Sequence, residues 1–542
     1  MDEGEIEVIS SSPSLNDVAE VLQRFLKNVA GIEFSFPSLN AYNNRAILWT
    51  ALFQHLQNKS SKSIHSICLA VIRVLSRDKT DLENLLCEKW ITTLIEMSGL
   101  YNYDGNDDNF NGVMALTDKE VMVEALKCLC NLTYNSEAAR AHCANTSIAQ
   151  GLVARLKVYK EISFKAEIML FDMKLMFILT ALRQDIKMKI KNELHGMDYL
   201  TTCLTEIVLE SPKLDDKNGY YQCMLSDQHQ AIVCDILKAQ FNLISQSSSE
   251  EPENKAEEAM FTRLTPVLMT LLCAQTSTKE KSIELKSNIA NLLTGVPPMF
   301  YLYLTPQLKE EETCQNTYNG RKMDALHALL DFLQHQLTIT TGIHNQYENL
   351  SPILTVLNKT SRGCRMFRKY LRQVVLPPLR DVSKPPEKGN TLRNQLCRLL
   401  TTPVTSVRDL VAEFLFILCK EKVSRMVKYT GFGNAAGHLA QKGLMGGAAG
   451  DYSSSSDDSD TEEYLRAAPH IDPVVGCTRP PRANPFEGMS DEQKEYEAMK
   501  LVNLFDKMMS DGVMKPARVG PDGRPQAIEH VLELREPPRT NS

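Results

Sequence analysis

The sequence predicts an all-α protein, built as an armadillo- or HEAT-like superhelix of helical repeats. Apolar residues recur with helical periodicity from about residue 14 to residue 428, and convincing alternating strands are absent. Three helices resemble one another, at 125–135, 235–245 and 286–295, because each ends an apolar run with Asn-Leu. Polar insertions make the spacing irregular, which is typical of such solenoids. The alternative is a large bundle of unrelated helices.

The predicted solenoid occupies residues 1–428. A chain of 542 residues is too long for one compact core, but each repeat of a solenoid packs only on its neighbours. Its first predicted helix begins at Ser14, a capping residue, and Val18, Leu22 and Phe25 form one apolar stripe along it.

The composition changes after residue 428. Glycines crowd residues 431–450, too many for a stable solenoid helix throughout. Residues 451–464 hold six acids, five serines and no base. Such a segment buries too little apolar surface to offset its ordering entropy. We therefore expect a Gly-rich, acidic and phosphorylatable linker at 429–489 that is disordered when free.

An amphipathic helix is predicted at 490–510. Ser490 and Gln493 have the spacing of a capping box, and Met499, Val502 and Phe505 lie on one apolar face. An isolated helix of this length is marginal in water, so it needs a partner surface. The Pro-rich and charged residues 511–542 are predicted to be a disordered tail.

Composition and motifs exclude several classes of function. The net charge of −7 argues against a general nucleic-acid binder. No apolar run reaches the ~18 residues of a membrane helix, and the acidic N-terminus is unlike a signal peptide. The fourteen scattered cysteines favour reduced, buried thiols. Because no catalytic, nucleotide-loop or metal spacing occurs, we expect no enzyme chemistry, cofactor or metal.

Arg73 and Arg77 are the first candidate binding residues. They are four residues apart and therefore adjacent on one helix face. Two guanidinium groups on one face suit a carboxylate or a phosphate. The alternative is a pair of solvated surface arginines, one of them tied to Asp78.

Asn131, Asn242 and Asn291 recur at equivalent points of the repeat-like helices. An asparagine amide both donates and accepts, so a ladder of amides can hold the backbone of a bound peptide. Alternatively, these asparagines brace adjacent repeats by bonding to loop carbonyls. Both interpretations fit the sequence.

Two further groups of side chains have alternative roles. Phe171, Phe177 and Phe241 lie in neighbouring apolar helices, where core packing is the default. A group of basic residues near the end of the solenoid either forms a solvated face or binds an acidic or phosphorylated segment. It comprises Arg362, Arg365, Arg368, Lys369 and Arg372.

Three serines of the acidic segment fit the pattern of acidophilic casein-kinase-2-type kinases. Ser454, Ser455 and Ser459 each have an acid three residues later. Each phosphate would add about −1.5 to −2 charges and strong acceptors for arginine. Short acidic serine runs are common, so the motif alone is a weak signal for phosphorylation. Its position between a solenoid with basic patches and an amphipathic helix makes the signal more specific.

Together these residues resemble the synembryn family, also called resistance to inhibitors of cholinesterase 8, which are cytosolic chaperones and exchange factors for heterotrimeric G-protein α subunits (Gα). The strings that carry the resemblance are IRVLSRD at 72–78, LKCLCNL at 126–132, FDMKLMFILTALR at 171–183, VLPPLRDV at 375–382, AEFLFILC at 412–419, KYTGFGNAAG at 428–437, DTEEY at 460–464 and NPFEGMSDEQKEYEAMKLVNLFDK at 484–507.

The resemblance implies a superhelix that holds the C-terminal helix and terminal carboxylate of Gα in its concave groove. It also implies that the helix at 490–510 braces the nucleotide domain of Gα through Met499, Val502 and Phe505, and that the acidic serines are activating phosphosites. The residues that it assigns to the Gα C-terminus are Arg73, Arg77, Asn131, Phe171, Phe177, Phe241, Asn242 and Arg362.

The implied activity is exchange and chaperoning by binding, without covalent catalysis. We expect a cytoplasmic monomer without a transmembrane segment, with recruitment to the cell cortex or plasma membrane through Gα. The alternative is an armadillo-type adaptor or transport receptor that carries peptide cargo without affecting nucleotides. The tail helix and the acidic serines favour the exchange factor over the adaptor, because a cargo adaptor has no evident need for them.

Overall fold

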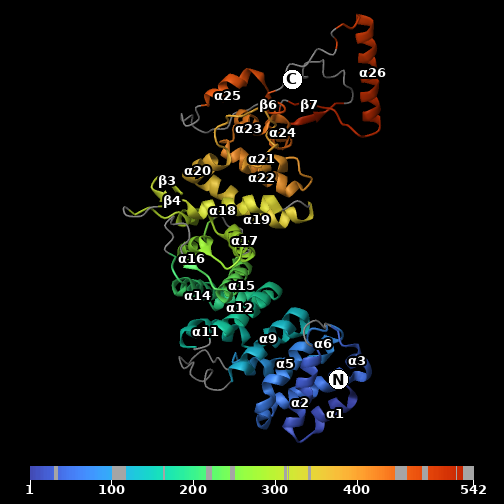
Figure 1. Cartoon of the computed structure of the whole chain (residues 1–542), viewed down its shortest axis with the longest axis vertical. Coiled ribbons are helices and arrows are strands. Elements are labelled where there is room, and N and C mark those ends of the chain that lie inside the picture. The colour runs from blue at the N-terminus through green and yellow to red at the C-terminus, as the bar shows by residue number, and fades with distance from the viewer. Residues whose placement is uncertain are drawn as a thin grey trace. The chain divides into compact units, whose positions relative to one another are not determined.

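The computed structural model describes residues 1–528 apart from 30–34, 101–117, 163–164, 215–222, 245–250, 310–313, 315, 340–342, 446–459, 479–485, 487 and 521 (Figure 1). The described chain is dominated by helices, so the predicted all-α class is confirmed. It divides into two units, described separately below. Unit 1 comprises 1–317 and 321–325, and unit 2 comprises 318–320 and 326–542.

Unit 1 is a succession of packed helices. Short β1 (Cys223–Met224) and β2 (Ala274–Gln275) pair in parallel between them. The helices are α1 (Glu3–Ser11), α2 (Leu15–Asn28), α3 (Pro37–Asn40), α4 (Asn44–Gln57), α5 (His65–Leu75), α6 (Leu82–Leu85), α7 (Glu88–Met97), α9 (Lys119–Asn135), α10 (Glu137–Ala144), α11 (Ile148–Val158), α12 (Lys165–Leu182), α13 (Gln184–Met188), α14 (Gly196–Glu210), α15 (Asp227–Ile244), α16 (Lys255–Leu272) and α17 (Lys279–Gly295), with short 3-10 or π turns at 41–43, 59–64, 159–161, 189–193 and 298–304.

The N-terminal helices follow the predicted caps with one addition. Ser14 accepts a hydrogen bond from the Asp17 amide, and Val18, Leu22 and Phe25 are buried, as the stripe in α2 predicted. The sequence analysis missed α1, which is held by a capping box between Asp2 and Glu5. This helix is short and buries few apolar side chains, so its periodicity is weak.

Five helices of unit 1 form an inner ladder, α5, α9, α12, α15 and α17, in which each packs on the next (Figure 1). The other long helices flank it, with α7 against α9, α14 against both α11 and α16, and α16 against α17. This nearest-neighbour packing is the defining property of an armadillo-like helical repeat.

Unit 2 also consists of packed helices, and α19 packs on both α20 and α22. Its helices are α18 (Asp324–Ile339, which begins in unit 1), α19 (Ile343–Gly363), α20 (Arg365–Val375), α21 (Leu392–Leu399), α22 (Thr405–Leu418), α23 (Val423–Thr430), α24 (Phe432–Gln441), α25 (Glu462–Ala467) and α26 (Asp491–Ser510), with a 3-10 turn at 468–470. Its strands are β5 (Ile471–Asp472), β6 (Cys477–Thr478), β7 (Ala517–Val519) and β8 (Pro525–Ala527), and β3 (Thr317–Tyr318) with β4 (Arg321–Lys322) lies at the boundary of the units.

The helices continue past residue 428, where the sequence placed the end of the solenoid. Helix α24 follows α23 after a sharp turn at Gly431, whose φ of +75° suits glycine. A Cβ there would lie 3.1 Å from the Val475 carbonyl carbon. The glycines thus allow residues 471–478 to pass close by, and the Phe432 and Gly433 amides donate to carbonyls of that segment.

The C-terminal part holds the predicted helix and an unpredicted hairpin. Ser490 and Gln493 form the capping box of α26, as expected. After it, β7 and β8 pair antiparallel, and the Met445 amide donates to the Gly523 carbonyl. Backbone pairing thus organises 517–519 and 525–527, within the segment expected to be a disordered tail. Residues 529–542 and Ser454, Ser455 and Ser459 lie outside the described residues.

The strands within the described ranges are two or three residues long, in line with the absence of predicted strands. All fourteen cysteines are free thiols and most are buried, which confirms the interpretation of their spacing. Among the residues that the structure describes, no helix combines the length and hydropathy that a bilayer crossing demands.

Candidate functional site

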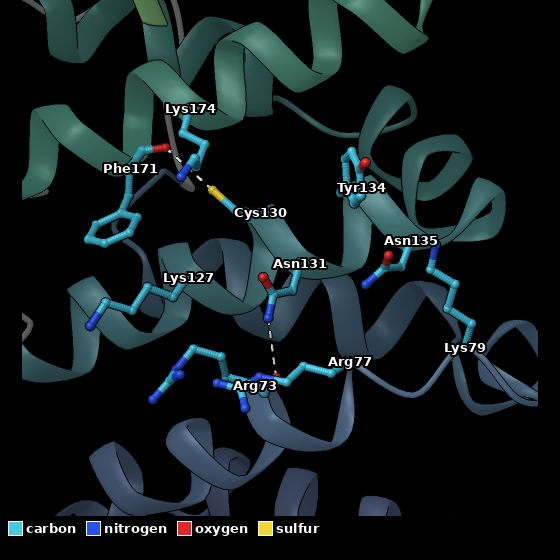
Figure 2. A pocket seen from close by; sticks show the side chains of 10 residues that line it. All are labelled: Arg73, Arg77, Lys79, Lys127, Cys130, Asn131, Tyr134, Asn135, Phe171 and Lys174. Atoms are coloured by element: carbon cyan, nitrogen blue, oxygen red, sulfur yellow. Dashed lines mark hydrogen bonds between the residues drawn. The ribbon is translucent and has the colours of Figure 1, made fainter. Parts of the chain in front are cut away.

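A cavity of about 510 Å³ opens beside the ends of α5, α9 and α12 (Figure 2). Five of its ten lining residues are cationic and none is acidic. A surface with this charge attracts anionic groups. We call it the cationic pocket; it is lined by Arg73, Arg77, Lys79, Lys127, Cys130, Asn131, Tyr134, Asn135, Phe171 and Lys174.

Arg73, on α5, is held by an acid from the next repeat. Its Nε donates to Glu124 Oε2 at 2.8 Å, and Lys127 Nζ lies 2.7 Å from the other oxygen of the same carboxylate. Burial opposes ionisation of Glu124, but the hydrogen bonds from Lys127 and Arg73 lower its pKa. Glu124 is therefore ionised at neutral pH, and its charge neutralises part of the pocket.

Arg77 follows α5 in a turn that is fixed from beneath by a buried ion pair. Arg45 and Asp78 are 3% and 2% exposed, and Arg45 Nη1 lies 3.9 Å from Asp78 Oδ2. Arg45 also donates to the carbonyls of Leu75, Asp78 and Thr80. The alternative that ties Asp78 to one of the pocket arginines is thus wrong, because Arg45 is its partner.

The Arg77 guanidinium itself makes no hydrogen bond or ion pair with any described residue. It is half-buried, and Figure 2 shows it beside Arg73 and Asn131. A guanidinium without a partner suits bidentate binding of a carboxylate. Of the two predicted arginines, Arg77 is the one left open for a ligand.

The asparagines form braces between successive inner helices. Asn131 Nδ2 lies 3.2 Å from the Arg73 carbonyl oxygen and 3.4 Å from Ser76 Oγ. Asn242 Nδ2, on α15, makes the same pair of contacts with α12 two steps along the ladder, 3.3 Å from the Phe177 carbonyl and 3.1 Å from Thr180 Oγ1. The equivalence predicted from sequence is therefore real for these two, and their amide donors serve the bracing role.

The three phenylalanines are half-buried and do not belong to the fully buried core that was the default. Phe171 lines the pocket, and Lys127 Nζ lies 5.3 Å from its ring centre. Phe177 has Lys238 Nζ at 5.6 Å. Phe171 and Phe177 of α12 thus each lie close to an ammonium group, and we call these two rings the aromatic strip; Phe241 lies on the neighbouring helix α15.

Arg362 belongs to unit 2, whereas the pocket belongs to unit 1. It lies at the end of α19 and pairs with Glu413. Glu413 also binds Lys442 at 2.8 Å, so this arginine takes part in a local ion-pair network. The structure does not bring Arg362 into the cationic pocket.

Helix α26 presents an open apolar face. Met499, Val502 and Phe505 are 63%, 42% and 41% exposed, and the helix has no buried residue. Large apolar side chains gathered in this way mark an interaction surface.

Sequence analysis missed part of the pocket. Lys127 and Asn135 lie four residues before and after Asn131, so helical periodicity alone puts them on the same face of α9. Lys174 is likewise three residues after Phe171. No comparable signal exists for Glu124 as partner of Arg73, because the two belong to different repeats.

The site offers charge and aromatic surface for binding. No cluster of His, Cys, Asp or Glu suited to a metal occurs in the part of the chain that the structure describes. The fold and the site therefore define a helical-repeat protein with a cationic, aromatic pocket, whose charge suits an anionic ligand.

Comparison with known proteins identifies the family. The family model described as "Guanine nucleotide exchange factor synembryn" matches residues 68–524. The protein named Chaperone Ric-8A of Danio rerio is 39% identical over 505 residues, covering 92% of this chain and 90% of the relative. Chaperone Ric-8 of Drosophila melanogaster is 36% identical over 544 residues, covering 92% of each. The chain therefore belongs to the synembryn family of guanine nucleotide exchange factors, as the resemblance predicted.

Two solved structures are similar at low identity. An engineered protein has a TM-score of 0.43 and 14% identity over 86% of this chain and 98% of its own. A designed armadillo repeat protein has a TM-score of 0.36 and 13% identity over 53% of this chain and 98% of its own.

Proposed function

We propose that this protein is a guanine nucleotide exchange factor and folding chaperone for heterotrimeric G-protein α subunits. It binds the C-terminal helix of Gα along the inner ladder of unit 1, with the terminal carboxylate in the cationic pocket. The observation that carries the proposal is the Arg77 guanidinium, which pairs with no described residue, in a cationic pocket that Arg73 and Phe171 also line, in a chain of this family. An arginine pair beside an aromatic ring suits a carboxylate that follows an apolar side chain.

Exchange requires only a difference in affinity. The C-terminal helix of Gα helps to organise its nucleotide site, so a protein that holds this helix away favours the open form and speeds GDP release. The same preference stabilises the nucleotide-free form against aggregation until GTP binds and restores the helix to its own site. Differential affinity for two states is sufficient for both effects.

The tail contributes a second contact in this proposal. The apolar face of α26, with Met499, Val502 and Phe505, covers the nucleotide domain of Gα while the ladder holds its C-terminus. The exposure of this face supports the assignment, since nothing in the described chain buries it.

The acidic serines Ser454, Ser455 and Ser459 are proposed targets of an acidophilic casein-kinase-2-type kinase. The described residues that follow them support a docked position, because Asp460 pairs with Lys428 on α23. Thr461 Oγ1 also donates to the Leu379 carbonyl. Phosphates just before these contacts would face Arg372 and Arg425, which line the same hollow.

We further propose that the protein acts as a cytoplasmic monomer, without covalent catalysis, and reaches the cell cortex or plasma membrane through Gα. The peptide-adaptor alternative rested on free asparagine amides. It loses that support because Asn131 and Asn242 direct their amide donors to the neighbouring helix.

The test is GDP release from purified Gα subunits of several classes, with and without the protein. An Arg73→Glu/Arg77→Glu variant should abolish the acceleration of GDP release, because it replaces two positive charges by two negative charges where the carboxylate binds. The matched control is Arg24→Glu/Arg263→Glu, which makes the same charge change at exposed arginines of α2 and α16. No acceleration with any Gα, and no complex with nucleotide-free Gα, would contradict the proposal.

A further inference from the structure

Glu124 is an acidic group that pairs with two of the cations lining the cationic pocket. It lies on α9 three residues before Lys127 and seven before Asn131, so the three residues share one helix face. Its side chain is 15% exposed. Solvent therefore screens its charge less than that of a fully exposed acid.

Its contacts are with pocket cations. One carboxylate oxygen accepts from Arg73 Nε at 2.8 Å and the other lies 2.7 Å from Lys127 Nζ. Two of the five pocket cations are thus already paired. Arg77, Lys79 and Lys174 make no ion pair with any residue that the structure describes.

We propose that Glu124 is an internal counter-ion that competes with the ligand carboxylate for Arg73, and so sets the selectivity of the pocket. This inference rests on the proposed function, because it assumes that a terminal carboxylate enters the pocket. An incoming carboxylate must either share Arg73 with Glu124 or displace it, and in both cases it meets a negative charge a few ångströms away. Glu124 therefore lowers affinity for any anionic end and lets only partners with additional apolar contacts bind well.

Such a competitor suits a protein that must release its partner. A pocket with five unopposed cations would bind any acidic chain end in the cell, including many that are not Gα. With Glu124 present, the carboxylate contributes orientation, and the aromatic strip along α12 supplies the discrimination. A weaker anchor also allows the partner to leave once its own helix site re-forms.

The experiment measures binding of two synthetic peptides to the full chain at fixed salt. Both carry the C-terminal residues of a Gα subunit, one ending in a free carboxylate and the other in an amide. Glu124→Gln should bind the carboxylate peptide about three- to tenfold more tightly than wild type, since it frees both Arg73 and Lys127 from their shared counter-ion and removes one repulsion. Its affinity for the amide peptide should change by less than about twofold on the same argument.

Three variants complete the design. Glu124→Asp keeps the charge and should show no gain. Glu206→Gln is the control. It removes an acid of the flanking helix α14 that pairs with Lys160, and it should leave the affinities for both peptides unchanged. Arg73→Gln/Glu124→Gln should recover part of the affinity that Arg73→Gln loses, because Glu124 no longer repels the carboxylate or neutralises Lys127.

The outcomes separate the two proposals. Equal or weaker binding of the carboxylate peptide by Glu124→Gln, in a wild type that prefers carboxylate to amide, overturns the role of Glu124 alone. A gain that is equal for both peptides also overturns it, because it reports a general packing change. A wild type that binds neither peptide overturns the proposed function and this inference with it.

Discussion

Replacing Asp78 by asparagine should loosen the turn that carries Arg77 and Lys79. The Asp78 carboxylate accepts hydrogen bonds from the Phe36 amide at 2.8 Å, the Thr80 amide at 2.9 Å and Asn40 Nδ2 at 3.0 Å. Although burial opposes ionisation, these bonds lower the pKa of Asp78 from 3.8 to about 2. A decrease of this size corresponds to roughly 2.5 kcal/mol of native-state stability at neutral pH.

We therefore expect Asp78→Asn to reduce the free energy of unfolding by about 2 to 3 kcal/mol at pH 7, at the low end of the range for breaking a buried ion pair. The sign of the pH dependence is fixed. A lowered native pKa stabilises the fold above the unfolded pKa, and this stabilisation is lost as pH falls toward the native pKa. The difference between wild type and variant should shrink by about 1 kcal/mol between pH 6 and pH 3.

The assay is urea unfolding followed by tryptophan fluorescence. Both tryptophans of the chain, Trp49 and Trp90, lie near this turn in unit 1, and the Trp90 ring stacks on Phe53 at 4.7 Å. The signal thus reports the unfolding of this region. Asp198→Asn is the control, because its partner Arg263 is exposed and such a pair contributes less than about 1 kcal/mol. A difference that stays constant with pH would refute the reasoning.

Two further predictions concern the tail. Phe505→Asp should leave the melting temperature unchanged, because the side chain is 41% exposed. It should reduce the protection of nucleotide-free Gα from aggregation. Unaltered protection would exclude α26 as a contact with Gα. Gly523→Val should release the hairpin of β7 and β8 from Gly443, since an added Cβ would lie 1.9 Å from the Gly443 carbonyl oxygen. Limited proteolysis should then cut 511–528 faster than in Gly512→Val, a glycine with open space around it; equal rates would show that the hairpin does not depend on that contact.

Helix starts, buried faces and equivalent positions were predictable where the pattern that indicates them lies within a single helix. Ser14 and Ser490 cap the helices that they were expected to cap, and the apolar stripe of α2 is buried. Asn131 and Asn242 were recognised as equivalent because the Asn-Leu ending recurs within each helix. Each cap lies within one turn of the amide whose hydrogen bond it accepts, and the apolar stripe and the Asn-Leu endings recur along single helices, so local periodicity contains the information.

The pairings across repeats could not be predicted in the same way. Arg73 with Glu124, and Arg45 with Asp78, join residues of different helices, and irregular insertions hide the register between those helices. The glycines after residue 428 were interpreted as ending the solenoid because glycine disfavours helix. In the structure Gly431 instead permits a close backbone approach by residues 471–478, which is a tertiary requirement.

One hydrogen bond, from Asn131 to Arg73, belongs both to the cationic pocket and to the packing between α9 and α5. Asn131 donates to the carbonyl of Arg73, so the residue that braces α9 against α5 also fixes the backbone of an arginine that lines the cationic pocket. Glu124, on the same helix, fixes the side chain of that arginine. A shift of α9 along α5 would move both contacts together. We therefore expect a ligand that moves Arg73 to act on the packing of α9 against α5 as well.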